Sequence, residues 1–200
     1  MKTILALLLI ASPIFAVEPR VARDRTYAKE AKERQTLDVY APAEGENHPV
    51  VIWIHGGGWR KGDKAGVQVK PQAFVAKGFV FVSINYRLIP QATLREMTGD
   101  VAQAIRWVHD HAKDYGGDPS TVFVMGHSAG AHLAALVCTD ERYLQSQGLA
   151  LSNIRGCVPL DTAVYDAATQ IASVEPIQPA RAASYKETFG DSVESQRALS

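Results

Sequence analysis

The sequence predicts an α/β protein with a mostly parallel, doubly wound sheet, and three observations support this fold class. Residues 50–54, 79–84 and 121–125 are apolar at nearly every position, as is typical of strands covered by helices on both faces. Helical patterns separate these strands along the chain, which favours parallel crossovers. Two of the strands run directly into segments that contain closely spaced glycines, at the sheet edge where folds of this kind bind ligands.

The first predicted elements begin at residue 35. Residues 35–40 have the composition of a strand, and the turn-rich stretch 41–49 leads into the apolar strand 50–54. A helix is predicted over 67–77, because Gly78 can end it and the strand 79–84 begins immediately afterwards.

The longest helix is predicted over residues 94–115. Its apolar residues recur at steps of three and four, which places them in one stripe: Leu94, Met97, Val101, Ile105, Val108, Ala112 and Tyr115. Gly116 and Gly117 end this pattern. The strand 121–125, the alanine-rich helix 129–138 and the strand 154–160 then complete the alternation of strands and helices.

Three segments divide the chain. Residues 1–16 contain Lys2, an apolar run too short to span a bilayer and a final Ala16, which predicts a cleaved secretory signal peptide. Residues 17–34 are polar and are expected to form a loosely held leader, and residues 35–200 are expected to form one α/β domain. The mature protein is therefore expected to be soluble and secreted or periplasmic, with no membrane span.

Composition and charge exclude several classes of function. The 200 residues contain 21 Lys and Arg against 21 Asp and Glu, with no basic run, so nucleic acid is not an expected partner. No Cys and His spacing suggests zinc, and Asp63 stands where a phosphate-binding loop needs lysine, so we expect no metal and no cofactor. The sequence leaves open whether Cys138 and Cys157 are free core thiols or a disulfide.

Residues 126–130 read Gly-His-Ser-Ala-Gly between a buried strand and a helix, which is the context of a nucleophile elbow. The sharp turn holds the serine, Ser128, in strained backbone geometry, and Gly126 and Gly130 let strand and helix approach closely. A second segment, His55-Gly56-Gly57-Gly58-Trp59, ends the strand 50–54. Its glycines allow backbone N–H groups to face a substrate oxygen, so Gly57, Gly58 and Ala129 are candidate oxyanion donors.

Together these motifs resemble the α/β-hydrolase superfamily, and within it the esterases and lipases with a His-Gly-Gly-Gly loop. The resemblance is closest to the feruloyl-esterase-like and hormone-sensitive-lipase-like carboxylesterases, and it extends from about Asp38 to Ala198. It also includes residues 85–88, 104–108 and 117–119.

The resemblance implies roles for particular residues. Ser128 is the expected nucleophile, with Gly57, Gly58 and Ala129 as its oxyanion donors. Trp59 and His127 are the candidate substrate-binding residues, the first as a wall of the acyl side. The resemblance also implies that His55 is structural. Arg87 and Asp100 are expected to pair with each other rather than bind substrate, because buried charges usually need partners.

The chain departs from this family where the rest of the triad is expected. In this fold the acid and then the histidine follow the serine. His132 is the one histidine after Ser128, and a residue four positions along the same helix belongs to the helix wall. Asp161 is the candidate acid at the end of the strand 154–160. The sequence therefore has no suitable histidine after Ser128. We expect that the C-terminal strand and helix units of the usual fold are missing and that the sequence is truncated.

The predicted function is a secreted serine carboxylic-ester hydrolase that works through an acyl-enzyme. Short-chain, acetylated-sugar and feruloyl esters are all compatible with the sequence. One alternative is an amide hydrolase, because the elbow also resembles that of kynurenine formamidases. A second alternative is a catalytically incompetent fragment or binding module, because the base is missing and the sheet would keep an uncovered edge.

Overall fold

The computed structural model of the chain describes residues 18–30, 33–162 and 164–200. Within them one six-stranded sheet has the order β1-β2-β4-β3-β5-β6. The strands are β1 (Arg20–Thr26), β2 (Thr36–Ala41), β3 (His48–Ile54), β4 (Val80–Ile84), β5 (Gly117–His127) and β6 (Gly156–Leu160). β3, β4, β5 and β6 pair in parallel, whereas β2 pairs antiparallel with both β1 and β4. The predicted mostly parallel α/β sheet is confirmed.

The described residues form seven helices, and the sequence predicts the first three of them. They are α1 (Lys70–Val75), α2 (Leu94–His111), α3 (Ala129–Thr139), α4 (Glu141–Gln145), α5 (Ala167–Val174), α6 (Pro179–Phe189) and α7 (Val193–Ala198). Short 3₁₀ turns occupy Ala112–Tyr115 and Leu151–Asn153. The single long helix predicted over 94–115 is therefore α2 continued by a 3₁₀ turn, which Gly116 ends in the left-handed conformation at φ 75°.

Two apolar clusters cover the two faces of the sheet. Along β3, Ile52 and Ile54 belong to the larger cluster, which includes residues of α2 and α3, whereas Val51 and Trp53 belong to a smaller one beside α1. This alternation is the two-residue period of a strand buried on both sides. It explains why the strand sequence reads as an unbroken apolar run.

The prediction of a loosely held leader over residues 17–34 is wrong for residues 20–26. These residues form β1, an edge strand whose side chains are almost all exposed. The Asp24 N–H donates to the Asp38 carboxylate at 2.9 Å, and Lys64 pairs with both carboxylates at 2.7 and 2.6 Å. Polar contacts rather than apolar burial hold β1, so its sequence carries no hydrophobic alternation.

The predicted pairing of Arg87 with Asp100 is confirmed. The Arg87 guanidinium donates to both oxygens of the fully buried Asp100 carboxylate, at 2.8 and 2.7 Å, and Gln35 donates to the same group at 2.8 Å. A buried carboxylate needs such partners, because an unpaired one would be costly to desolvate. The pair ties the loop after β4 to α2.

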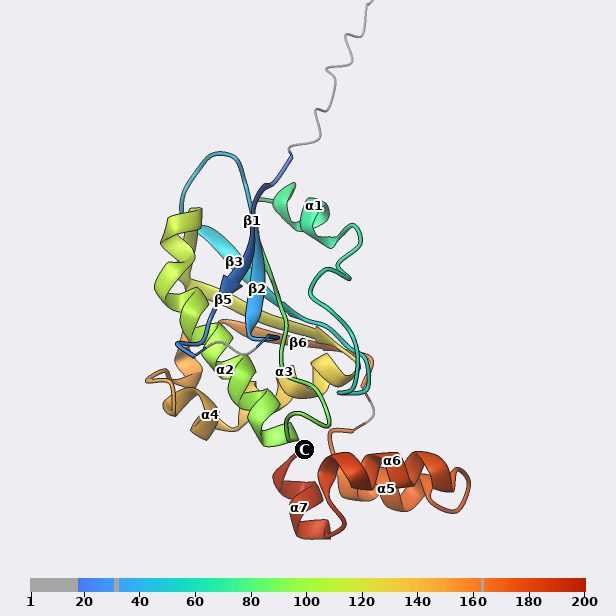
Figure 1. Cartoon of the computed structure of the whole chain (residues 1–200). Helices are drawn as coiled ribbons and strands as arrows, with labels where there is room; N and C mark the ends of the chain where they lie inside the picture. Colours follow the sequence, from blue (N-terminus) through green and yellow to red (C-terminus); the bar gives the residue numbers. More distant parts are fainter. Residues whose placement is uncertain (1–17, 31–32, 163) are drawn as a thin grey trace, which may run out of the picture.

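Helices α5, α6 and α7 form a cluster beyond the end of the sheet (Figure 1). This cluster approaches the segment that follows β3, where Arg60 forms an ion pair with Glu187 of α6 at 2.5 Å. Among the described residues no helix is long and apolar enough to cross a membrane. The predicted signal peptide over 1–16 lies outside the described residues. Cys138 and Cys157 are both free and half-buried in the structure.

Candidate active site

The turn from β5 into α3 holds Ser128 in a strained backbone conformation, with φ 54° and ψ −119°. Such a conformation is costly for a residue with a side chain and persists only where the surroundings impose it. Here the Ser128 N–H donates to the Leu160 carbonyl at 2.9 Å, and the Ser128 carbonyl accepts from His132 N–H at 3.1 Å. The backbone of β6 and the first turn of α3 therefore fix the serine at the carboxyl end of the sheet.

Two glycines make this turn sterically feasible. A Cβ on Gly126 would lie 2.2 Å from the Gly130 carbonyl oxygen, and a Cβ on Gly130 would lie 2.2 Å from the Ile54 carbonyl oxygen. Both distances are far below a van der Waals contact, so each position excludes any side chain. The two glycines of the elbow pattern are therefore required because the backbones of β3, β5 and α3 approach so closely.

The segment after β3 lies against the elbow. A Cβ on Gly56 would lie 2.8 Å from the His127 carbonyl oxygen and 3.2 Å from Ser128 Cβ. The segment turns back on itself where the N–H groups of Arg60 and Lys61 donate to the Gly57 carbonyl, at 3.2 and 3.1 Å. Gly57, Gly58 and Trp59 all have positive φ, at 129°, 60° and 60°. The glycine loop predicted as an oxyanion loop is therefore next to the serine.

Two hollows meet at Ser128. The larger, about 900 Å³, contains Gly57, Gly58, His127 and Ser128 and continues over the loop as far as Lys70. The smaller, about 290 Å³, is lined by the following residues from the loop, the elbow, the end of β6 and α6: Gly58, Trp59, Ser128, Ala129, Asp161, Thr162, Val164, Arg181 and Tyr185. Every candidate residue of the sequence prediction lines at least one of these hollows.

Trp59 is 5% exposed and belongs to an aromatic cluster that connects the loop with α3 and α6. Its ring makes edge contacts with His132, Tyr185 and Phe189 at centroid separations of 5.7, 6.5 and 5.3 Å. Its indole Nε1 is buried and has no hydrogen-bond partner among the described residues. Trp59 therefore combines core packing with a position in the wall of the smaller hollow.

The structure brings His127 and Asp161 together, with His127 Nε2 and Asp161 Oδ2 3.7 Å apart. Both side chains are solvent-exposed, His127 to 50% and Asp161 to 91%. Asp161 has a left-handed backbone with φ 55°. In the part of the chain that the structure describes, no hydrogen bond connects a histidine side chain with Ser128. Asp161 and His127 therefore do not complete a triad with Ser128 there.

His132 points into the core, in agreement with the expectation that it belongs to the helix wall. Its Nε2 lies 2.8 Å from the Leu199 carbonyl oxygen, so Nε2 carries the proton of the neutral ring. The ring is only 1% exposed, and burial lowers its pKa to about 4. This histidine is a packing residue, and its side chain is not available to accept a proton from the serine.

His55 is structural, as the resemblance implies. Its ring stacks on Tyr86 at 4.5 Å, and the Tyr86 hydroxyl donates to the His55 carbonyl at 2.9 Å. Burial and the nearby Arg34 guanidinium both lower the pKa of His55. Arg34 also donates to the Gly62 carbonyl at 2.7 Å, so the same group supports the far end of the glycine loop.

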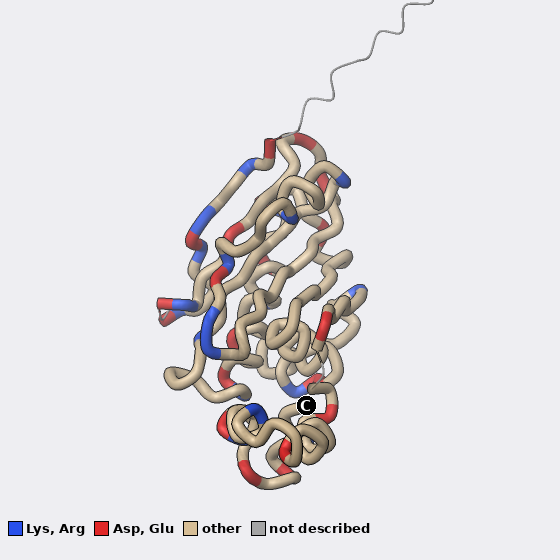
Figure 2. Tube along the Cα trace, turned by 90° about the vertical axis from the view of Figure 1, so that its right-hand side faces the viewer, with Lys and Arg blue, Asp and Glu red and all other residues tan. Residues whose placement is uncertain are grey.

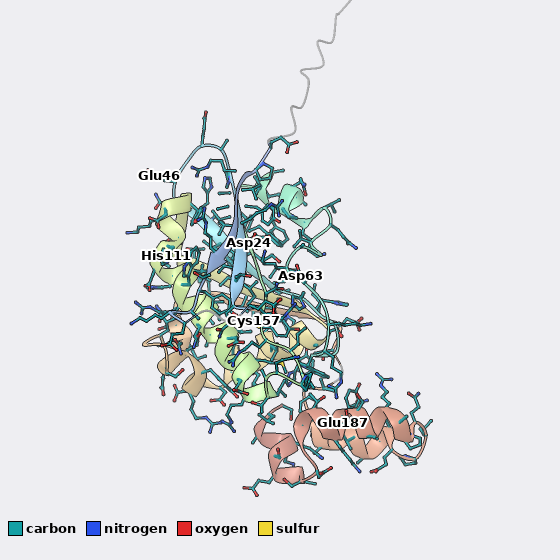
Figure 3. All side chains as sticks on the ribbon, in the orientation of Figure 1. Asp24, Glu46, Asp63, His111, Cys157 and Glu187 are labelled. Atoms are coloured by element: carbon teal, nitrogen blue, oxygen red, sulfur yellow. The ribbon has the colours of Figure 1, made fainter. Side chains whose placement is uncertain are left out.

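Sequence reasoning missed the residues that α6 and the segment 60–70 add to this region. Arg60 pairs with Glu187, which Figure 3 labels on α6, and Tyr185 lines the smaller hollow. These contacts join positions more than a hundred residues apart in the sequence, so no local motif could reveal them. The described residues contain no cluster of three or more His, Cys, Asp or Glu side chains that could hold a metal ion.

A nucleophile elbow, an adjacent glycine loop and a mostly parallel sheet together define the chain as an α/β-hydrolase. The profile of one family, BD-FAE, matches residues 37–172, and the chain belongs to that family. The match includes the loop, the elbow and the end of β6.

Curated relatives of the chain are named as esterases. A probable isoprenylcysteine alpha-carbonyl methylesterase of Oryza sativa subsp. japonica is 34% identical over 134 residues, which are 66% of this chain and 32% of that protein. Esterase LipQ of Mycobacterium tuberculosis is 43% identical over 100 residues, 47% of this chain and 23% of that protein. The chain thus matches about a third or less of these relatives' length.

Solved structures support the same fold. Esterase B from Lactobacillus rhamnosis aligns with a TM-score of 0.67 and 25% identity, over 86% of this chain and 56% of that chain. The predicted resemblance to α/β-hydrolase esterases is confirmed by the family match, these relatives and this structure.

Proposed function

We propose that the protein is a serine carboxylic-ester hydrolase in which Ser128 is the nucleophile and the N–H groups of Gly57, Gly58 and Ala129 form the oxyanion hole. The observation that carries this proposal is the strained Ser128 at the junction of two hollows, next to the glycine loop. Ala129 begins α3, so its N–H has no acceptor within the helix and remains available to a substrate oxygen. The esterase names of the relatives support the same chemistry.

The proposed reaction has two halves. Ser128 Oγ attacks the ester carbonyl carbon while its proton passes to a histidine base, and the carbonyl oxygen becomes an oxyanion held by the backbone N–H groups. The base then returns the proton to the departing alcohol oxygen. In the second half, water attacks the acyl-enzyme in the same way and releases the carboxylic acid and the free serine. The dipole of α3 also favours negative charge beside its first residues.

The base is the incomplete part of this proposal. His55 and His132 are buried and hydrogen-bonded within the core, and His127 faces Asp161 at the surface. We propose that the histidine base comes from a part of the protein outside residues 1–200. Asp161 stays a candidate acid, at the end of the strand that holds the Ser128 N–H.

Hydrolysis by the complete protein tests this function. We expect turnover of p-nitrophenyl acetate and butyrate, and a loss of about 10³-fold or more in kcat/KM in Ser128→Ala. Ser173→Ala, on the exposed face of α5, serves as the matched control and is expected to retain full activity. Equal activity in Ser128→Ala and wild type would refute the nucleophile assignment.

Two further outcomes decide between the alternatives. Preferential turnover of N-formylkynurenine over the esters would identify an amide hydrolase. A folded protein that turns over neither substrate would support the non-catalytic alternative.

The export of the protein is a separate proposal. It rests on the signal-peptide pattern of residues 1–16. Mass spectrometry of the mature protein in its natural host is expected to find a new N-terminus near Val17. An intact N-terminus in a cytoplasmic fraction would contradict it.

A further inference from the structure

The larger hollow at Ser128 is a groove with an unbalanced set of charges. Three cationic side chains line it, Arg60, Lys61 and Lys70, against the single carboxylate of Asp63. Figure 2 shows positive and negative residues distributed along the whole chain trace, and the sequence as a whole has equal numbers of cations and anions. The excess of positive charge is therefore a local property of this groove.

The carboxylate of the groove is already engaged. Asp63 accepts hydrogen bonds from Asn85 Nδ2 and the Ala65 N–H, both at 2.9 Å, and pairs with Arg34 at 3.8 Å. Arg60 is also neutralised, because it pairs with Glu187 at 2.5 Å. Lys61 and Lys70 are the two cations of the groove that form no ion pair among the described residues. Their charges are available to a ligand.

Lys70 is held in place rather than free to move in solvent. Its ammonium group lies 4.6 Å from the centroid of the Trp53 ring, and its side chain is half-buried. Trp53 itself is 5% exposed, so its ring face is the fixed surface over which the ammonium sits. A cation–π contact of this kind fixes the position of the charge and leaves its N–H donors unused.

The register of the sheet places Trp53, which the Lys70 ammonium contacts, a few residues before the level of the elbow. Trp53 pairs with Met125 across β3 and β5, and Ser128 follows Met125 by three residues. At about 3.3 Å per residue, the backbone advances by at most about 10 Å from the level of Trp53 to Ser128. Lys70 and Ser128 line the same groove.

We propose that the groove binds the alcohol part of the substrate and that Lys70, with Lys61, recognises an anionic group on that alcohol. This inference rests on the proposed ester-hydrolase function and names its substrate class, an ester whose alcohol part carries a carboxylate. The smaller hollow of about 290 Å³ then receives the acyl group. The groove, at about 900 Å³, has room for the larger and more polar part of the substrate.

Hydrolysis of a matched substrate pair tests the charge recognition. We compare para-acetoxybenzoate with para-acetoxybenzamide, which have the same acyl group and ring and differ in the charge one ring away from the ester. The ratio of their kcat/KM values is expected to fall about fivefold in Lys70→Met and about tenfold or more when Lys61→Gln is added, with each variant compared against wild type.

Two control variants separate charge from folding. Lys70→Arg keeps the charge and is expected to hold the ratio within about twofold of wild type. Lys77→Met removes an exposed cation just beyond α1 that does not line the groove, and it is expected to leave the ratio unchanged. Raising the salt concentration from about 0.05 M to 0.5 M should weaken the wild-type preference, because exposed charges are screened. An identical ratio in wild type and Lys70→Met overturns the proposal.

A binding experiment decides the same point without catalysis. p-Nitrophenyl glucuronide and p-nitrophenyl glucoside differ in a carboxylate, and neither is an ester. In a hydrogen–nitrogen correlation spectrum the glucuronide is expected to shift the Trp53 indole signal, with the Trp107 indole on α2 as the internal reference. The glucoside and the Lys70→Met variant should show little shift.

The two experiments also distinguish which idea fails. If neither acetoxy compound is hydrolysed but the glucuronide shifts Trp53, the ester-hydrolase function fails and the anion-binding groove stands. If both esters are hydrolysed with no effect of Lys70→Met and no glucuronide shift, the groove assignment fails and the hydrolase function stands.

Discussion

The ends of β5 and β6 lie side by side, yet they differ in how tightly their residues are packed. At the end of β5, Gly126 and Gly130 allow backbone segments to meet so closely that no Cβ fits, and Ser128 is fixed between them. At the end of β6, Asp161 is 91% exposed and the strand also exposes Val158 and Leu160, at 41% and 37%. The parallel pairing of β5 with β6 continues as far as His127 and Leu160, and the Ser128 N–H donates to the Leu160 carbonyl beyond it.

This difference in packing separates the well-supported part of the candidate site from the exposed part. Ser128, the proposed nucleophile, and Gly56 and Gly57 of the glycine loop have close backbone neighbours within this chain. The end of β6, where the candidate acid Asp161 lies, is far more exposed. The following predictions test whether the two ends respond to substitution as unequally as their packing indicates.

The largest effect is expected in the elbow. Gly130→Ala places a Cβ 2.2 Å from the Ile54 carbonyl oxygen and 2.5 Å from that of His55, which the structure can relieve only by separating β3 from α3. We expect the free energy of unfolding in urea to fall by about 3 kcal/mol or more. Gly99→Ala, on α2 with no atom near its Cβ, is the control and should be neutral or stabilising by up to about 1 kcal/mol. Similar stabilities for the two variants would show that the elbow is not tightly packed.

Within the glycine loop, Gly57 is expected to be far less tolerant than Gly58. A Cβ on Gly57 would lie 2.0 Å from the Lys61 carbonyl oxygen, whereas a Cβ on Gly58 meets no atom within 4 Å. If the loop holds the oxyanion, Gly57→Ala lowers kcat/KM about a hundredfold by displacing the N–H donors, and Gly58→Ala lowers it by less than about tenfold. Steady-state ester hydrolysis measures both. Equal losses would mean that the loop geometry does not depend on the Gly57 contact.

His132 is expected to make the protein less stable in acid. Its pKa falls from 6.5 in the unfolded chain to about 4 in the core, so the unfolded state binds more protons between these values. Its stabilising contribution is present above pH 6.5 and is lost as the pH falls toward 4. Between about pH 7 and pH 5 the loss is about 2 kcal/mol.

The His132→Leu variant removes this proton-linked term. Its free energy of unfolding is therefore expected to depend less on pH across the same interval than that of wild type. Parallel urea titrations of both proteins at each pH make the comparison. Identical pH profiles would contradict the burial of a neutral imidazole.

The smallest effect is expected at the end of β6. Asp161→Asn removes a carboxylate that is 91% exposed and 3.7 Å from His127, so we expect a stability change within about 0.5 kcal/mol. Thermal denaturation measures it directly. A large loss of ester hydrolysis without loss of stability would instead identify Asp161 as the acid of the triad.

Much of the fold could be predicted because its signals are local. Apolar runs marked β3, β4 and β5, and the glycine spacing of the elbow marked the position of Ser128. The strand β1 could not be predicted, because it is held by Asp24, Asp38 and Lys64 rather than by an apolar pattern. The cluster of α5, α6 and α7 could not be predicted from the sequence either.

The candidate site also contains residues that local sequence patterns reveal and residues that only the tertiary packing brings together. Gly57, Gly58, Ser128 and Ala129 were predictable, since backbone sterics at an elbow and a glycine loop leave a sequence pattern. The parts of the hollow walls that α6 contributes were not predictable. Tyr185 and the pairing of Arg60 with Glu187 depend on how α6 lies against the loop after β3.

The identity of the nucleophile is tested most directly by covalent labelling. The complete protein is treated with a fluorophosphonate, digested, and analysed by mass spectrometry for the position of the adduct. We expect one adduct per chain on the peptide that contains Ser128, and none in Ser128→Ala. An adduct on another serine, or no adduct on a folded and complete protein, would contradict it.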